Sequence, residues 1–215
     1  MKKRKENLKK RFRNNYTLFY TRKRIGATKQ FINTSYVDSG GIIVDLGARQ
    51  GSFNSIFREL NFQKIIAVDI DAKALEKNDA DEKYIIDLEE KFPFGNNFYE
   101  CIYAAEIIEH LERRKELLKE IYRILKPSGK LILTTPNKKS IIAFFDKVIG
   151  RFVVNGKWNG HDYSHKYVYD FYEIKDLLIE VGFKIIAIES FYLFYGLPTR
   201  TKTSLGMCTW IFAKK

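Results

Sequence analysis

Short apolar runs alternate, through the middle of the chain, with segments whose apolar residues recur every three or four positions. Apolar runs of about four to eight residues rich in Ile, Val and Leu are typical of buried strands, and the wider spacing is typical of helices. The predicted strands are 42–46, 64–69, 83–87, 99–105 and 130–135, and the predicted helices are 52–60, 72–78, 113–125 and 170–181. This alternation predicts an α/β fold with a parallel sheet that is covered by helices on both faces.

The end of the chain has a different pattern. Gly182 follows the last predicted helix, and two further apolar runs, 183–192 and 206–213, come after it. Two strands that are joined by a long loop suit an antiparallel hairpin at the edge of a sheet. The pattern therefore predicts a mixed sheet whose last two strands are antiparallel.

The first predicted strand ends in a carboxylate and a turn that contains glycine. Asp45 comes two residues before Gly47, and Gly51 ends the turn before the next helix. Glycine has no Cβ, so the backbone at these two positions can come close to a ligand. The second strand ends at Asp69, whose carboxylate can accept hydrogen bonds from both hydroxyls of a ribose. A strand, a tight turn and a helix in this order predict a pocket for an adenosine-type cofactor.

Dinucleotide-binding folds carry three glycines spaced G-x-G-x-x-G, which admit a pyrophosphate, and this turn has no such triplet. Four segments instead resemble, in order and spacing, the class I S-adenosylmethionine-dependent methyltransferases, in particular their type 11 group. These segments are VDLGARQG, AVDID, YIIDLEEKFPFGNNFYECIYAAEIIEHL and RILKPSGKLILTTPN. The family turn usually has a middle glycine where this chain has Arg49, so the Arg49 side chain must point away from the ligand or contact the methionine carboxylate.

The resemblance implies a fold, a cofactor and a set of contacts. The implied fold is a Rossmann-like, doubly wound sheet of seven strands with a C-terminal antiparallel hairpin, and the implied cofactor is S-adenosyl-L-methionine. The carboxylate and turn after the first strand would line the methionine end, the acid after the second strand would bind the ribose, and the end of the third strand would meet the adenine. The implied cofactor-binding residues are Asp45, Gly47, Ala48, Gly51, Asp69, Ile70, Asp87, Leu88 and Glu106.

The segment E-x-x-E-H after the fourth predicted strand is similar to the metal site of the small-RNA 3′-terminal 2′-O-methyltransferases and of ubiquinone-pathway O-methyltransferases. This similarity implies that Glu106, Glu109, His110 and His165 bind Mg²⁺, Mn²⁺ or Zn²⁺, which suit carboxylate and imidazole ligands. Such a metal would bind vicinal hydroxyls and lower the pKa of the attacking oxygen. Without a metal, His110 or His165 is a candidate catalytic base, and the alternative is that the segment only shapes the pocket.

The net charge of +12 is concentrated at the N-terminus. Residues 1–30 contain twelve Lys or Arg and one acidic residue, whereas the other 185 residues contain 26 basic and 25 acidic ones. Apolar side chains there recur at helical spacing, at Leu8, Phe12, Tyr16, Phe19 and Tyr20. A basic amphipathic helix can lie on an anionic membrane surface, bind nucleic acid phosphates or dock on its own domain, and the sequence leaves these three alternatives open.

Length and composition indicate one domain with additions. We expect a basic N-terminal extension at 1–33, a methyltransferase domain at 34–215 and, within it, an insertion at 137–169 that acts as a lid or packs into the core. Cys101 and Cys208 lie in apolar, strand-like segments and are expected to be reduced core residues. No apolar run is long enough to span a bilayer, and no secretory signal is evident. We therefore expect a cytoplasmic protein, with peripheral membrane contact as an alternative.

Three functions follow as hypotheses. The first is methyl transfer to an oxygen of a small-molecule, lipid or glycan acceptor, which the near-neutral domain and its apolar insertion favour. The second is an RNA methyltransferase that uses residues 1–30 to bind phosphates, although a nucleic-acid enzyme usually carries positive charge around its cleft. The third is a non-catalytic interaction module in which Arg49 prevents cofactor binding. The sequence does not decide the oligomeric state.

Overall fold

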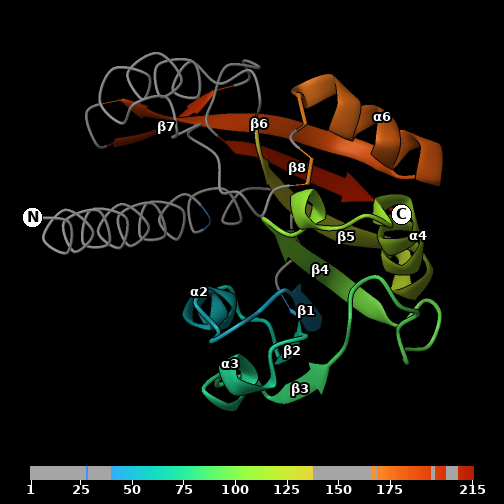
Figure 1. Ribbon diagram of the computed structural model, residues 1–215. Helices are drawn as coiled ribbons and strands as arrows, with labels where there is room; N and C mark the ends of the chain where they lie inside the picture. The colour runs from blue at the N-terminus through green and yellow to red at the C-terminus, as the bar shows by residue number, and fades with distance from the viewer. Residues whose placement is uncertain (1–27, 29–39, 138–165, 168, 195–196, 202–207) are drawn as a thin grey trace, which may run out of the picture.

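A mixed sheet with strand order β3-β2-β1-β4-β5-β8-β6-β7 runs through the molecule (Figure 1). The computed structural model describes residues 28, 40–137, 166–167, 169–194, 197–201 and 208–215. The strands are β1 (Ile42–Leu46), β2 (Lys64–Asp69), β3 (Glu82–Ile85), β4 (Tyr99–Ala105), β5 (Leu125–Pro136), β6 (Lys184–Phe194), β7 (Leu197–Thr201) and β8 (Cys208–Lys214). The helices are α2 (Asn54–Glu59), α3 (Ala72–Glu76), the 3₁₀ turn η1 (Ile108–His110), α4 (Arg114–Ile124) and α6 (Phe171–Val181).

The predicted seven-stranded arrangement is confirmed. Strands β1 to β5 are parallel, while β8 pairs antiparallel with both β5 and β6. Within the part of the chain that the structure describes, β7 adds a short eighth strand beside β6. The predicted element boundaries differ from the observed ones by a few residues, the largest difference being β5, which begins at Leu125 instead of residue 130.

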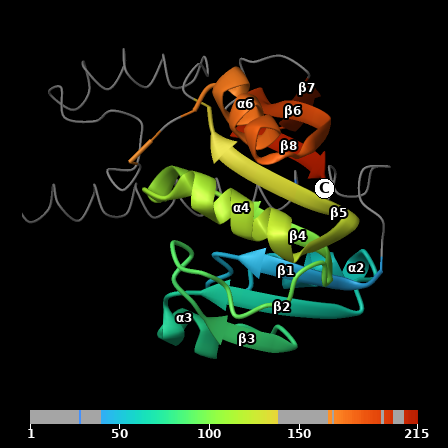
Figure 2. The ribbon, with the colours of Figure 1, turned by 90° about the vertical axis from the view of Figure 1, so that its right-hand side faces the viewer.

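Each face of the sheet carries its own helices (Figures 1 and 2). Successive residues of a strand point to opposite faces, so β1 contributes Val44 to the core that holds α4 and α6, and Ile43 to the core that holds α2 and α3. Both residues are fully buried. The strands are therefore apolar on both faces, which is why they appear in the sequence as uninterrupted Ile and Val runs.

Helix α6 has well-defined ends. The Asp170 side chain accepts hydrogen bonds from the N–H groups of Tyr172 and Glu173, and the Glu173 side chain accepts one from the Asp170 N–H, which forms a capping box. At the other end, Gly182 adopts the left-handed conformation with φ of 112°, as a C-terminal glycine usually does. These caps fix where the chain leaves the helix and enters β6.

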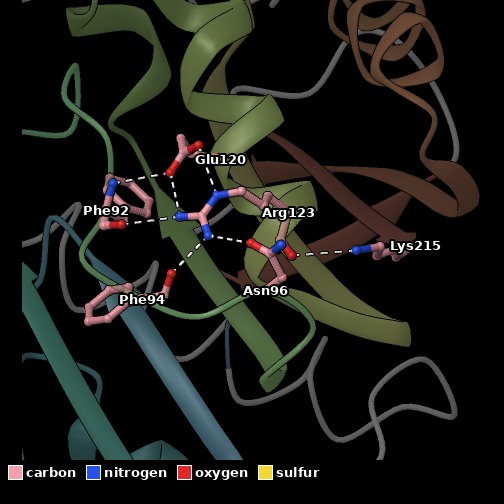
Figure 3. Close-up of polar contacts among 6 residues, drawn as sticks. All are labelled: Phe92, Phe94, Asn96, Glu120, Arg123 and Lys215. Atoms are coloured by element: carbon pink, nitrogen blue, oxygen red, sulfur yellow. Dashed lines mark hydrogen bonds and ion pairs between the residues drawn. The ribbon is translucent and has the colours of Figure 1, made fainter.

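The Arg123 side chain fastens the loop between β3 and β4 to α4 (Figure 3). Its guanidinium makes a salt bridge to Glu120 and donates to the carbonyls of Phe92 (3.1 Å) and Phe94 (2.8 Å) and to Asn96 Oδ1 (2.7 Å). The hydrogen bonds and charge of Arg123 in turn lower the pKa of Glu120. One planar group thus satisfies several acceptors of a loop that has no regular structure.

We expect Arg123→Ala to lower the free energy of unfolding by about 1–3 kcal/mol, because the loop carbonyls lose a charged donor. Arg123→Lys should recover only part of the loss, since an ammonium cannot reproduce the planar fork of donors. Urea denaturation followed by circular dichroism measures both variants. If the lysine variant were as stable as the unchanged protein, the planar arrangement of donors in the Arg123 guanidinium would not matter for stability.

Two further expectations concern the core and the membrane. Neither Cys101 nor Cys208 forms a disulfide and both are buried, as predicted. Across the described ranges, none of the helices is long and apolar enough to cross a bilayer. Except for Thr28, the expected extension at 1–33 lies outside the described residues, as does most of the insertion at 137–169, so these assignments stay predictions.

Candidate functional site

The site lies at the carboxyl ends of β1, β2 and β4. β1 pairs with β2 on one side and with β4 on the other, so the chain winds in opposite directions from β1. In open α/β sheets a crevice forms at such a reversal, outside the carboxyl ends of the strands. Asp45, only 2% exposed, occupies the last but one position of β1 at this crevice.

The turn after β1 folds over the end of β2. The N–H groups of Gly47 and Ala48 both donate to the Val68 carbonyl, at 2.8 and 3.1 Å. Gly47 has a φ of 75°, and a Cβ built on it would lie 2.4 Å from Cγ2 of Ile107. Only glycine fits both the backbone conformation and the space at this position. The turn is thereby held against the strand that carries Asp69.

Asp69 is positioned by backbone groups. Its Oδ2 accepts a hydrogen bond from the Arg49 N–H (2.9 Å), and its Oδ1 accepts one from the Asp71 N–H (2.8 Å). Each carboxylate oxygen can accept a second bond. Asp69 can therefore receive both hydroxyls of a ribose while it holds the turn, which fits the predicted role.

Two buried asparagines support the turn from below. The Asn78 side chain donates to the Arg49 carbonyl (3.0 Å) and accepts from the Asn54 side chain (2.8 Å). Asn54 and Asn78 are 1% and 2% exposed. A Cβ on Gly51, whose φ is 78°, would lie 2.5 Å from Asn54 Nδ2. The turn thus packs directly on these amides.

The side of the crevice toward β3 is apolar and open. Ile70 follows Asp69 and is 65% exposed, and Ile85, which pairs with Asp69 at the end of β3, is 66% exposed. Asp87 is also exposed, and its Oδ1 accepts the Glu89 N–H (2.9 Å), which forms a turn. Leu88 is partly buried and packs on the core. Two exposed isoleucines beside a carboxylate are suited to the flat face of an adenine.

These features together fit S-adenosylmethionine. The glycine turn has no side chain where a Cβ would collide, a positioned carboxylate can receive the ribose, and apolar surface is available for the base. Arg49 is exposed, and its backbone takes part in the turn. The residues predicted for the methionine and ribose ends, from Asp45 to Ile70, are thus brought together at one edge of the sheet.

Glu106 directly follows β4 and has a left-handed conformation, with φ of 55°. Its N–H donates to the Thr134 carbonyl (3.0 Å), and its Oε1 accepts from the Thr134 hydroxyl (3.0 Å) and the Cys208 thiol (3.2 Å). The side chain is thereby directed toward β5 and β8. Its predicted contact with the cofactor stays a prediction.

Glu109 and His110 lie in η1, directly after β4. The Glu109 side chain is fully buried, and its Oε2 accepts from the Thr135 hydroxyl at 3.2 Å. His110 is partly exposed, with its Nε2 4.0 Å from Oε1 of Glu109. The pair therefore has the arrangement of a base with a supporting carboxylate.

The arrangement bears on the predicted metal ligands. Glu106 bonds to Thr134 and Glu109 bonds to Thr135, and consecutive strand residues point to opposite faces. The two carboxylates are therefore directed to opposite sides of β5. Among the described residues, no three or more His, Cys, Asp or Glu side chains gather as metal ligands. His165 lies outside the described residues, so the metal set and the role of His165 stay predictions.

The chain that leads into α6 is fastened to the His110 turn. The N–H groups of Lys166 and Tyr167 donate to the Glu109 carbonyl, at 2.9 and 3.1 Å. The Arg114 guanidinium lies 3.4 Å from the centroid of the Tyr167 ring and donates to the Tyr169 hydroxyl (2.8 Å). Burial raises the pKa of Tyr169, an effect that Arg114 opposes.

The contacts of Arg114 and the support that Asn54 and Asn78 give to the turn after β1 were not predicted. Spacing along the sequence does not show which distant loops meet.

Comparison with known proteins agrees with this geometry. Residues 20–188 match a protein family whose description is "Methyltransferase domain". An uncharacterized protein of Methanocaldococcus jannaschii is 30% identical over 163 residues, which are 76% of this chain and 62% of that protein. A ubiquinone/menaquinone biosynthesis C-methyltransferase of Haemophilus ducreyi is 25% identical over 113 residues, 47% of this chain and 44% of that protein. The matched region thus spans less than two thirds of either relative.

The fold also has close counterparts among solved structures. A methyltransferase of Thermotoga maritima, described as S-adenosylmethionine-dependent and as a possible histamine N-methyltransferase, superimposes with a TM-score of 0.72 at 19% identity, over 95% of this chain and 97% of that one. At this identity the likeness concerns the fold alone. Because the family match covers most of the chain, the protein belongs to this methyltransferase family, and its fold and glycine turn agree with the predicted cofactor, S-adenosylmethionine.

Proposed function

We propose that this methyltransferase transfers the methyl group to an oxygen atom of a small-molecule, lipid or glycan acceptor, with His110 as the general base. The observation that carries the proposal is the pairing of a partly exposed imidazole with the fully buried Glu109 carboxylate, in the turn directly after β4. A hydroxyl acceptor must lose its proton during transfer, and this pair is suited to receive it.

The chemistry divides between the cofactor and the chain. The bound cofactor supplies a sulfonium methyl that is already electrophilic. Asp69 and the glycine turn hold the cofactor, which places the methyl for in-line attack, and placement of this kind supplies a large part of the rate. His110 accepts the proton of the hydroxyl as the methyl group moves from sulfur to oxygen, and Glu109 lies beside its Nε2.

The charge distribution supports an acceptor other than a nucleic acid, because residues 31–215 carry almost no net charge. Residues 1–30, with twelve basic side chains and one acidic one, are proposed to bring the enzyme to an anionic surface. An RNA acceptor is the alternative. In that case, deletion of residues 1–30 would abolish a methylation of RNA that depends steeply on salt.

The atom that receives the methyl can be identified directly. The protein is incubated with ¹³C-methyl S-adenosylmethionine and with separate lipid, polar-metabolite and RNA fractions of the cells that make it. The ¹³C chemical shift of the product distinguishes methyl groups bound to oxygen, nitrogen and carbon. We expect an oxygen-bound methyl in the lipid or metabolite fraction, and a product methylated on nitrogen or carbon would overturn the proposal.

We expect His110→Ala to lower kcat by about 100-fold or more, because the acceptor loses its base. Binding of S-adenosylhomocysteine, measured by calorimetry, should change by less than about twofold. Glu109→Gln keeps the shape of the buried side chain but removes its charge, so it should give a smaller loss. An unchanged kcat in His110→Ala would exclude the imidazole as the base, and loss of activity in EDTA would favour the predicted metal site.

A further inference from the structure

We infer that Asn78 is a positioning residue for cofactor binding, because it holds Arg49 in the left-handed backbone conformation that the turn after β1 requires. The inference concerns binding of the cofactor and does not depend on the identity of the acceptor. Its failure is therefore distinguishable from failure of the proposed oxygen transfer.

The conformation of Arg49 is unfavourable by itself. Its φ is 47°, and in this region the Cβ of an L-residue approaches the following carbonyl oxygen. The resulting penalty disfavours the conformation by about 5- to 30-fold. A glycine at this position would avoid the penalty, so the surrounding structure must hold Arg49 in place.

Two side chains hold the backbone of Arg49 from both sides. Its N–H donates to Asp69 Oδ2 at 2.9 Å, and its carbonyl accepts from Asn78 Nδ2 at 3.0 Å. These two groups bracket the φ and ψ angles of the residue. One of the two partners, Asp69, is the carboxylate that receives the ribose, so the geometry of Arg49 and the binding of the cofactor are directly linked.

Asn78 is itself fixed in orientation. Its Oδ1 accepts from Asn54 Nδ2 at 2.8 Å and from the Ala80 N–H at 2.9 Å. With both of these donors on the oxygen, the amide nitrogen must face Arg49. Asn78 is 2% exposed, so water does not readily replace the bond that it donates.

Removal of the Asn78 amide should leave the fold intact and the turn less populated in its binding conformation. The measured dissociation constant rises in inverse proportion to the fraction of protein in the competent conformation. We expect Asn78→Ala to weaken S-adenosylhomocysteine binding by about tenfold, measured by calorimetry on the full chain. At saturating cofactor, kcat should change much less than the KM for the cofactor.

A second substitution gives the decisive test. In an Arg49→Gly background the left-handed conformation carries no Cβ penalty. Asn78→Ala should then weaken S-adenosylhomocysteine binding by less than about threefold. Ser128→Gly is the matched control, because Ser128 has a φ of 64° at the amino-terminal part of β5, away from the crevice. In the Ser128→Gly background, Asn78→Ala should still weaken S-adenosylhomocysteine binding by about tenfold.

Asn78→Asp guards against a general loss of folding in the alanine variant. It retains an oxygen for Asn54 and Ala80 but has no N–H for the Arg49 carbonyl. We expect the same weakening and the same dependence on Arg49→Gly, with a cooperative thermal transition. Unchanged binding in both Asn78 variants would overturn the inference. The inference would also be overturned if Asn78→Ala weakened S-adenosylhomocysteine binding equally in the Arg49→Gly and Ser128→Gly backgrounds.

Discussion

Replacement of Asp69 by alanine is expected to weaken S-adenosylhomocysteine binding by at least about 100-fold. The carboxylate is expected to receive both ribose hydroxyls, and a hydrogen bond to a charged group contributes about 1.5–3 kcal/mol. The alanine variant would also leave the N–H groups of Arg49 and Asp71 without their present acceptor. The turn would therefore lose its attachment to the end of β2 at the same time. Isothermal titration calorimetry measures the effect.

Two variants separate these contributions. Asp69→Asn keeps one acceptor oxygen without the charge, so its loss of affinity should be intermediate. Glu90→Gln removes an exposed carboxylate from the neighbouring loop and should leave affinity unchanged. A loss of less than about tenfold in Asp69→Ala would mean that the ribose lies elsewhere.

Gly47→Ala is expected to have the largest effect on stability at the site. The left-handed backbone at this position costs an alanine about 1–2 kcal/mol. The new methyl group would also overlap Ile107, since a Cβ on Gly47 lies 2.4 Å from Cγ2 of Ile107. Overpacking of this kind costs a further ~1–3 kcal/mol. Urea denaturation should show the sum, and binding of S-adenosylhomocysteine should fall because the turn must shift.

Ile107→Ala tests the steric part of this argument. Ile107 is 8% exposed, so its truncation alone should destabilise the protein by about 2–4 kcal/mol. In the double variant the added methyl occupies part of the space that the isoleucine leaves. The double variant should therefore be more stable than the two single effects predict together. Strict additivity would show that the methyl group and the isoleucine do not compete for space.

The fold was predictable because local patterns and the overall architecture agree. Buried parallel strands need apolar residues on both faces, so β1 and β2 are visible as Ile and Val runs. Gly182 marks the end of α6 for an equally local reason, the left-handed backbone. The early start of β5 was missed, because the pairing of Leu125 with Tyr99 precedes a shift in register, and a shift of this kind leaves no regular alternation.

The candidate site was predictable only where one residue carries the chemistry. Gly47 and Asp69 are evident from their places after two strands, since the carboxyl ends of parallel strands share one edge. Asn78 supports Arg49 from 29 positions further along the chain, and nothing in the spacing reveals this contact. The separation of Glu106 and Glu109 across β5 depends on which consecutive threonine each one meets, and this too is set by tertiary packing.

Thr134 and Thr135 face opposite sides of the sheet, and this limits which changes of length β5 can accept. A deletion or insertion of one residue before them in β5 would turn both hydroxyls to the opposite face of the sheet. One threonine would then take the place of the other, so one of the two glutamates would lose its hydroxyl partner. The long antiparallel pairing of Lys130–Pro136 with β8 resists such a slip. Natural variation in this strand should therefore consist of substitutions, with changes of length confined to the loops.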